Sequence, residues 1–212
     1  ASAKDAAYLV SPGAGGKGYA IAHKVVYGDT AYISNGAVRS EADALHFLPG
    51  RFTPGDERRY EFSVLLKDWT PWKQGDTINE TNIYQLKLTA GEVPLQVRIK
   101  RNAVNLRFAK ANNTPVVEIL KDFRPFAGEW IHFRVDVLWS TSDTGYMKTY
   151  LKLPGQNEYS LVDSKTNYLT YPSNGKAGQI GYVKWGIYNG KNYLSRIIYH
   201  DDIRIIDLKK EQ

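Results

Sequence analysis

Hydrophobic and polar residues alternate along most of this chain, which is the pattern of β-strands that bury one face and expose the other. The alternating stretches are 60–66, 95–100, 104–108, 131–137, 146–153 and 182–188, and an isoleucine-rich stretch over 196–208 predicts the last strand. Turn signals such as Pro49-Gly50 and Ala90-Gly91 separate them. Strands at regular spacing with short turns predict an all-β fold, either a sandwich or a jelly roll.

Little of the chain has helical periodicity. Only 40–48 predicts a short helix, with Ser40 as its N-cap. No linker, composition shift or internal repeat divides the chain, so we expect a single domain over residues 1–212. Arginine, lysine and tyrosine recur on the polar strand faces, which indicates that one sheet is open to solvent and curves around a ligand.

The composition narrows the class of partner. Hydrophobic residues make up 42% of the 212 residues, enough for a sizeable core, and the formal net charge of +6 favours anionic partners. Nucleic acid, an acidic membrane and an acidic polysaccharide all fit this charge, and so does a surface that is charged only for solubility. The absence of cysteine excludes disulfides and thiolate metal sites.

The start of the chain bears on its location. Ala1-Ser2-Ala3 resembles what remains at a small-residue signal cleavage site, and it equally resembles residues added for expression. No stretch reaches the length of a membrane span. We expect a secreted or periplasmic protein that has no membrane partner.

The stretch 182–189 carries the most specific chemistry in the sequence. As a strand it places Tyr182, Lys184, Gly186 and Tyr188 on one face, opposite a core face of Val, Trp and Ile. The glycine is interpreted as leaving room for a ligand against the sheet. Two phenols and an ammonium on one face suit a site that binds an anionic sugar and removes a proton from it.

This stretch, Tyr-Val-Lys-Trp-Gly-Ile-Tyr-Asn, resembles the C-terminal motif of the jelly-roll alginate lyases (polysaccharide lyase family seven), whose second tyrosine transfers the proton; it corresponds to Tyr188. Those enzymes also carry a Gln-aliphatic-His triplet, where this chain has Gln85-Leu86-Lys87. The departure points to the glucuronan lyases (family twenty), described as jelly rolls that use a glutamine, a tyrosine and a histidine from an earlier segment. His46 lies at a suitable distance upstream of Gln85. The resemblance covers the chain from about residue 60 onward and implies a jelly-roll β-sandwich of two antiparallel sheets with a concave substrate groove.

The resemblance implies cleavage of a polyuronate by β-elimination, with β-1,4-glucuronan first and alginate second. The enzyme removes the C5 proton and expels the C4 oxygen, and neutralising the neighbouring carboxylate is the largest catalytic requirement. Tyr188 would act as both base and acid in a syn elimination, with Gln85 and His46 on the carboxylate. A phenolate forms readily only beside positive charge, for which Lys184 is the first candidate. The predicted substrate-binding residues are Lys184, Arg98, Lys87, Tyr182 and Arg107.

Each of these residues also has an ordinary structural interpretation. By alternation Gln85 shares a face with Ile83, Lys87 and Thr89, and it could be a solvated strand residue. Tyr188 could pack against the sheet, and His46 could be partly buried. The other three histidines, His23, His132 and His200, carry no motif and are interpreted as structural. Trp69 and Trp72, in the loop over 68–81, could form a sugar-stacking lip or anchor that loop to the core.

Asp201 and Asp202 lie in the isoleucine-rich last stretch, where adjacent carboxylates must be paired or coordinated. The resemblance implies a structural calcium ion here, with Asp202 as a ligand. An ion pair with Arg196 or Arg204 is the alternative. The chemistry itself requires no cofactor.

Three other functions share part of this pattern. A glycoside hydrolase needs two carboxylates facing the groove, and the sequence places none on the faces that carry Gln85 and Tyr188. A non-catalytic module that binds acidic polysaccharide would use the same tyrosines and basic residues without proton transfer. A nucleic-acid partner ranks last because the chain has no recognisable motif or basic cluster. We expect a monomer with an anionic polysaccharide as its partner.

Overall fold

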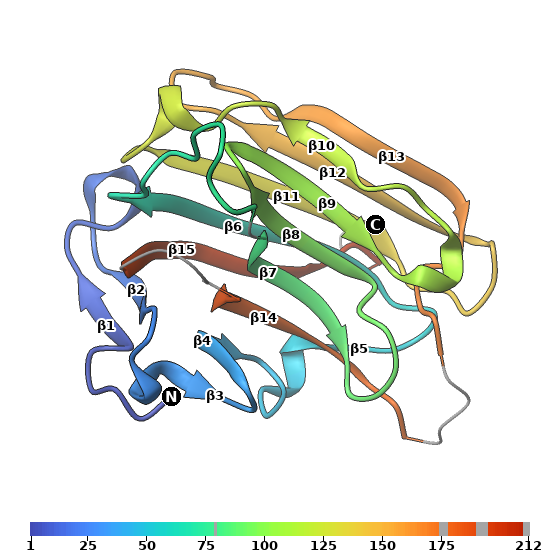
Figure 1. Cartoon of the computed structure of the whole chain (residues 1–212). Helices are drawn as coiled ribbons and strands as arrows, with labels where there is room; N and C mark the ends of the chain where they lie inside the picture. The colour runs from blue at the N-terminus through green and yellow to red at the C-terminus, as the bar shows by residue number, and fades with distance from the viewer. Residues whose placement is uncertain (79, 174–177, 190–194, 210–212) are drawn as a thin grey trace.

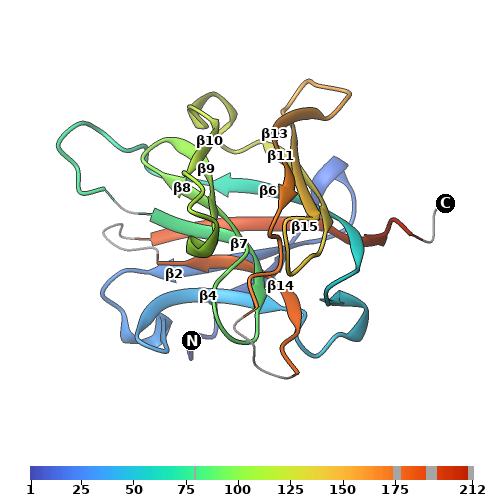
Figure 2. The same cartoon turned by 90° about the vertical axis from the view of Figure 1, so that its right-hand side faces the viewer.

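Two antiparallel sheets lie face to face in this computed structural model, which describes residues 1–78, 80–173, 178–189 and 195–209 (Figure 1). The first sheet has the order β1 (Ala7–Val10), β2 (Ala20–Val26), β15 (Ser195–Asp207), β6 (Glu57–Lys67), β11 (Trp130–Leu138), β12 (Gly145–Lys152), β13 (Ser160–Tyr168). The second has the order β10 (Val117–Leu120), β9 (Ala103–Phe108), β8 (Leu95–Lys100), β7 (Glu80–Leu88), β14 (Gly181–Tyr188), β4 (Ala37–Asp43), β3 (Ile33–Ser34), and β5 (Arg51–Phe52) also pairs with β14. Figure 2 shows the two layers from the side. The fold is the predicted jelly-roll β-sandwich.

The core lies between the sheets and is rich in aromatic rings. Phe62 of the first sheet stacks on Tyr84 of the second, with ring centroids 3.7 Å apart, and on Phe133 at 4.8 Å. Apolar side chains at alternate positions of β6, β8, β9, β11 and β12 complete it, as the alternation predicts. Among the described residues, no helix has the length and hydrophobicity needed to cross a membrane.

The predicted helix over 40–48 is wrong. Residues 37–43 form β4, which pairs with β14, and only a short 3₁₀ turn, η3 (Leu48–Gly50), follows. Ser40 is 5% exposed, and its hydroxyl donates to the Ala6 carbonyl instead of capping a helix. The partner strand β14 lies far away in sequence, so local periodicity could not indicate the pairing.

An irregularity in β7 changes the face that was predicted for Ile83. The register shifts between Asn82 and Tyr84, so Asn82 pairs with Arg98 while Gln85 pairs with Gln96. Because Arg98 and Gln96 are two residues apart on β8, Asn82 and Gln85 share one face. Ile83, which simple alternation places beside Gln85, belongs to the core.

A second irregularity, in β14, corrects the interpretation of Gly186. Its φ is +129°, and a Cβ there would collide with the Ser40 carbonyl oxygen and lie 2.8 Å from the Glu41 Cα. The backbone of β4 therefore occupies the space beside this glycine. Glycine is required by its backbone conformation and by close strand packing, not by a ligand.

His23 and His200 lie in the core, with their rings edge to face at 5.6 Å. Burial lowers the pKa of His23 from 6.5 to about 4, and burial together with His23 lowers the pKa of His200 to about 3. Below pH 6.5 the unfolded chain takes up protons at these positions while the folded protein does not. Above pH 6.5 the two buried histidines do not reduce the free energy of unfolding. As the pH falls from 6.5 toward 4, the free energy of unfolding decreases.

We predict that the free energy of unfolding falls by up to about 1.4 kcal/mol per pH unit for each of these histidines between pH 6 and pH 4. Chemical denaturation across this range measures the slope. His200→Gln is expected to lose its share of the slope, whereas His46→Ala, at an exposed turn position, should keep the whole of it. Equal slopes in the wild type and His200→Gln would contradict the assignment.

Candidate active site

Two rows of polar side chains cross the outer face of the second sheet, which we call the groove face. Neighbours in a row are paired across adjacent strands and so point to the same side. The first row consists of Arg39, Tyr188, Asn82, Arg98 and Asn105. The second consists of Asp43, Lys184, Gln85, Gln96 and Arg107. Tyr188 and Gln85, which the sequence predicts to act on one sugar unit, therefore lie on the same face.

Gln85 is held within a chain of hydrogen bonds along the second row. Its Nε2 donates to Glu41 Oε1 at 2.7 Å, and its Oε1 accepts from Gln96 Nε2 at 3.2 Å. The Oε1 of Gln96 accepts in turn from Arg107 Nη1 at 3.3 Å. Because a carboxylate can only accept and a guanidinium can only donate, the two ends of this chain determine the orientation of both amides.

The sequence predicts no carboxylate on the groove face, but Asp43 ends the second row and Glu41 lies at the centre of the face. Its side chain is 6% exposed and accepts from Lys184 Nζ at 2.9 Å as well as from Gln85. It was missed because Glu41 follows Ser40 in the stretch predicted as a helix. As a β4 residue paired with Gly186, it projects beside the β14 motif.

Arg39, the last residue before the stretch predicted as a helix, was also missed, and its guanidinium contacts Tyr188. Its guanidinium lies over the phenol ring, 4.5 Å from the centroid. Lys184, the cation predicted to assist Tyr188, is instead ion-paired with Glu41. The cation next to the phenol ring is thus supplied from β4, and this guanidinium also lies 3.8 Å from Glu41 Oε2.

The predicted substrate-binding residues all lie on the groove face. Burial and the neighbouring Lys184 lower the pKa of Lys87, and burial with Arg107 lowers the pKa of Arg98 to about 10. Arg98 is ion-paired with Glu80, and Tyr182 pairs across the sheet with Lys87. Positive charges are therefore close together and partly desolvated on this face, an arrangement that an anionic ligand relieves.

His46 lies in the exposed turn after β4. The backbone N–H of Ala44, two residues earlier, donates to the Val183 carbonyl. Val183 is five residues from Tyr188 along β14, which at about 3.3 Å per residue is on the order of 16 Å. The structure therefore places His46 near the other end of β14 from Tyr188, and its catalytic role stays a prediction.

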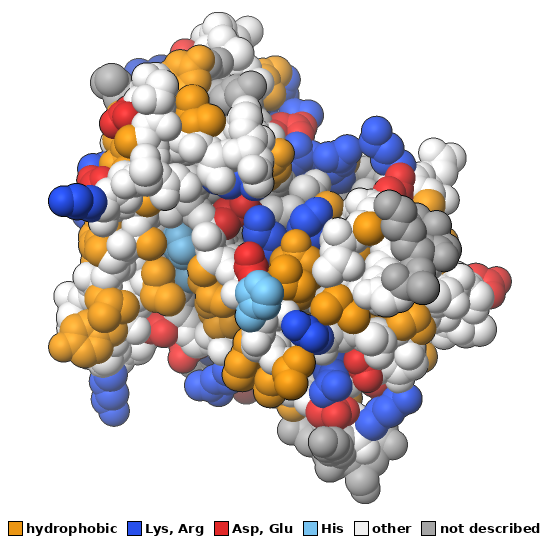
Figure 3. Space-filling view, turned by 90° about the horizontal axis from the view of Figure 1, so that it is seen from below, with side chains coloured by type: hydrophobic (Ala, Val, Ile, Leu, Met, Phe, Trp, Pro, Cys, Tyr) orange, Lys and Arg blue, Asp and Glu red, His pale blue; other side chains and the backbone are white. Residues whose placement is uncertain are grey.

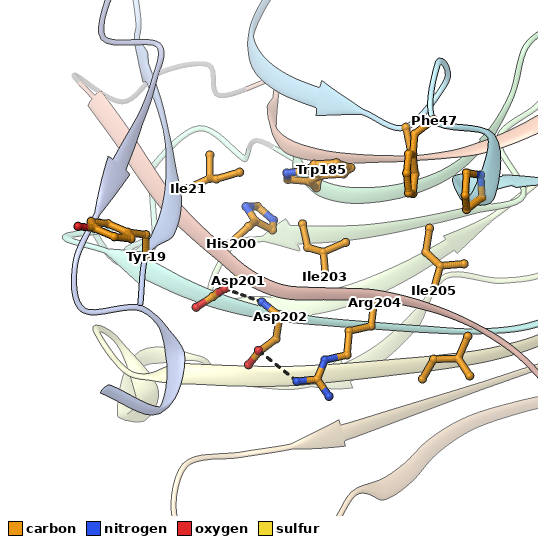
Figure 4. Close-up of a pocket in the computed structure, with 13 residues that line it drawn as sticks. Tyr19, Ile21, Phe47, Trp185, His200, Asp201, Asp202, Ile203, Arg204 and Ile205 are labelled. Atoms are coloured by element: carbon orange, nitrogen blue, oxygen red, sulfur yellow. Dashed lines mark hydrogen bonds and ion pairs between the residues drawn. The ribbon is translucent and has the colours of Figure 1, made fainter. Parts of the chain in front are cut away.

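Asp202 belongs to the first sheet, away from the groove face. Its Oδ1 lies 3.6 Å from Arg204 Nη2 (Figure 4), and its Oδ2 accepts from the Ser63 hydroxyl at 3.4 Å. This is the ion pair that the sequence left as the alternative to calcium. Within the described residues, no group of three or more His, Cys, Asp or Glu side chains is arranged to hold a metal. A calcium ion at Asp202 stays a prediction.

One cavity contains neither Tyr188 nor Gln85, and Asp202 and Arg204 are among the residues that line it. It has a volume of about 720 Å³ and lies between the sheets, where Trp185 and Phe47 face Ile203 and Ile205 (Figure 4). The molecule seen from below is hollowed, with hydrophobic side chains gathered around the hollow (Figure 3). A separate hollow of about 480 Å³ on the groove face is lined by Arg39, Glu41, Asp43 and Lys184 together with N-terminal residues.

Similar structures share this fold across nearly the whole chain. An endo-β-1,4-glucuronan lyase from the fungus Trichoderma reesei has a TM-score of 0.65 and 16% identity, over 95% of this chain and 87% of that one. A marine alginate lyase from Aplysia kurodai has a TM-score of 0.60 and 10% identity, over 96% and 87%. The catalytic domain of a glycoside hydrolase family 131 protein from Coprinopsis cinerea has a TM-score of 0.62 and 11% identity, over 96% and 78%. At these identities the likeness shows the fold alone.

The family assignment comes from the sequence. No curated protein sequence matches the chain. The family model described as polysaccharide lyase matches residues 2–204, which is nearly all of it. The arrangement of a tyrosine, an amide and several cations on one open face agrees with such an activity. This chain therefore belongs to the polysaccharide lyase family.

Proposed function

We propose that the protein is a lyase that cleaves a polyuronate, with β-1,4-glucuronan as the first candidate and alginate as the second. The observation that carries the proposal is Tyr188 beneath the Arg39 guanidinium, on the same face as the oriented amide of Gln85. Family membership and the fold shared with a glucuronan lyase support it.

In the proposed reaction, the Tyr188 phenolate removes the C5 proton, and the resulting phenol returns a proton to the C4 oxygen as the glycosidic bond breaks. One group can do both because the two atoms lie on the same side of the ring in a β-linked glucuronan. Arg39 stabilises the phenolate before the proton is taken.

Gln85 would neutralise the C6 carboxylate as the C5 anion develops. Its Nε2 carries two hydrogens, of which one is used by Glu41 and one is left to donate. The cations Lys87, Arg98 and Arg107 add positive potential across the same face. His46, near the other end of β14 from Tyr188, would contact the polymer at a different sugar unit.

We further propose a secreted or periplasmic monomer that acts on polysaccharide outside the cytoplasm. The strongest rival within the same geometry is a binding module that holds an acidic polysaccharide without cleaving it. Such a module would need the cations and the aromatic rings but not the phenolic hydroxyl of Tyr188.

The test is a panel of acidic polysaccharides, namely glucuronan, alginate blocks, pectate and hyaluronan, assayed for the ultraviolet absorbance of unsaturated uronic acid ends. We expect absorbance with glucuronan, and alginate is the next candidate. Folded protein that produces no absorbance with any of these polymers, but still binds one of them, would establish the binding module instead.

A further inference from the structure

A second hollow lies at the far end of the first row of the groove face, beyond Arg98. It has a volume of about 310 Å³ and lies between the β8–β9 hairpin, the loop of Trp72 and the segment around Lys121. We propose that this distal hollow binds an anionic sugar unit of the polymer, several units away from the bond at Tyr188. The inference rests on the proposed function and assigns a second binding position to the same substrate.

The row of paired residues connects the two places. Tyr188 is followed across the sheet by Asn82, Arg98 and Asn105, and Asn105 also lines the distal hollow. Three strand spacings of about 4.8 Å put Asn105 roughly 14 Å from Tyr188. A polysaccharide that crosses the strands along this row therefore reaches the distal hollow.

The charges in the distal hollow favour an anion. Its charged lining residues are Lys100, Arg101, Lys121 and Arg124 against Glu118 and Asp122. Lys100 is paired with Glu80 at 2.9 Å, and Arg124 with Asp122 at 2.6 Å. In the described part of the chain, Arg101 and Lys121 have no acidic side chain within ion-pair distance. These two cations are therefore available to form ion pairs with a carboxylate of the polymer.

Trp72 supplies a rigid aromatic wall. Its backbone N–H donates to Asn102 Oδ1 at 2.8 Å, and its carbonyl accepts from Asn102 Nδ2 at 3.0 Å. The indole is half-buried, and the Arg101 guanidinium lies over it, 5.1 Å from the ring centroid. Trp69 differs, because it is buried and anchors the loop by donating to the Ile197 carbonyl. The loop is thus fastened at two points, which lowers the entropy lost when a sugar binds.

The backbone conformation at Arg101 indicates that the arginine side chain has a function. Arg101 has φ +55°, a left-handed conformation that costs an L-residue about 1–2 kcal/mol and that glycine or asparagine adopts more easily. A hairpin turn alone would be better served by glycine. Strain of this kind is typical of positions where the side chain has a function.

The test compares two double variants that lose the same charge. Arg101→Gly with Lys121→Ala removes both free cations and suits the turn, while Lys17→Ala with Lys148→Ala removes two lysines that line no groove-face hollow. Both pairs are made in a Tyr188→Phe background, and binding to the polyuronate cleaved best, or to glucuronan if none is cleaved, is measured by calorimetry at low and high salt. We expect Kd to rise about threefold to tenfold only in the first pair, and the difference to shrink in high salt.

A length series separates the distal hollow from general attraction. With Tyr188 restored, the first pair should lower kcat/KM on long oligouronates and leave the shortest cleavable ones unchanged. Equal losses in the two pairs, or equal losses at all lengths, would overturn the distal site while leaving the lyase proposal intact. If no polyuronate is cleaved but the first pair still binds glucuronan more weakly than the control pair, the lyase proposal fails and the binding site stands.

Discussion

Tyr188→Phe is expected to lower kcat on the cleaved polyuronate by about 10²–10⁴-fold, the usual contribution of a positioned proton-transfer group. The substitution removes only the hydroxyl, so the ring keeps its place beneath Arg39. Binding of the polymer should change little, because the cations of the groove face remain. Initial rates of unsaturated-product formation, together with Kd from calorimetry, measure the two effects separately.

Tyr150→Phe is the matched control for this variant. Tyr150 is a half-buried residue of β12 in the first sheet, whereas Tyr188 belongs to the second. It should retain wild-type activity. Near-normal turnover in Tyr188→Phe would refute the assignment of this phenol as base and acid, and the second tyrosine of the motif would then be a binding residue.

Gly186→Ala is expected to destabilise the protein by about 3 kcal/mol or more. The new methyl group would collide with the Ser40 carbonyl oxygen and crowd the Glu41 Cα, which forces β4 away from β14. The φ of +129° adds strain for any residue with a Cβ. For a protein of this size the loss corresponds to a fall in Tm of roughly 6–12 °C, measured by thermal unfolding.

Gly155→Ala separates the two causes. Gly155 also has a positive φ, +80°, but a Cβ there would meet nothing within 4 Å. This variant should lose only the conformational part, on the order of 1 kcal/mol. If both variants lose equal stability, close packing of β4 against Gly186 is not what requires glycine there.

The error over residues 40–48 had direct consequences for the site. A serine followed by charged and small residues is locally compatible with a helix N-terminus. The same residues form a strand because β14 offers backbone partners and the core offers a place for the Ser40 hydroxyl. Once β4 is a strand, Arg39 and Glu41 point to the groove face, and both of the contacts that sequence reasoning missed follow from that.

By itself, the sequence determined the all-β class, the core faces of β6, β8, β9, β11 and β12, and the face that carries Lys184 and Tyr188. These follow from period-two alternation, which depends only on the order of neighbouring residues. The tertiary structure alone decided that Arg39 meets Tyr188, that Glu41 holds Gln85 and Lys184, and that Asn82 replaces Ile83 on the groove face. Cross-strand contacts depend on which strands pair and in which register, and one bulge moves the following side chains to the other face.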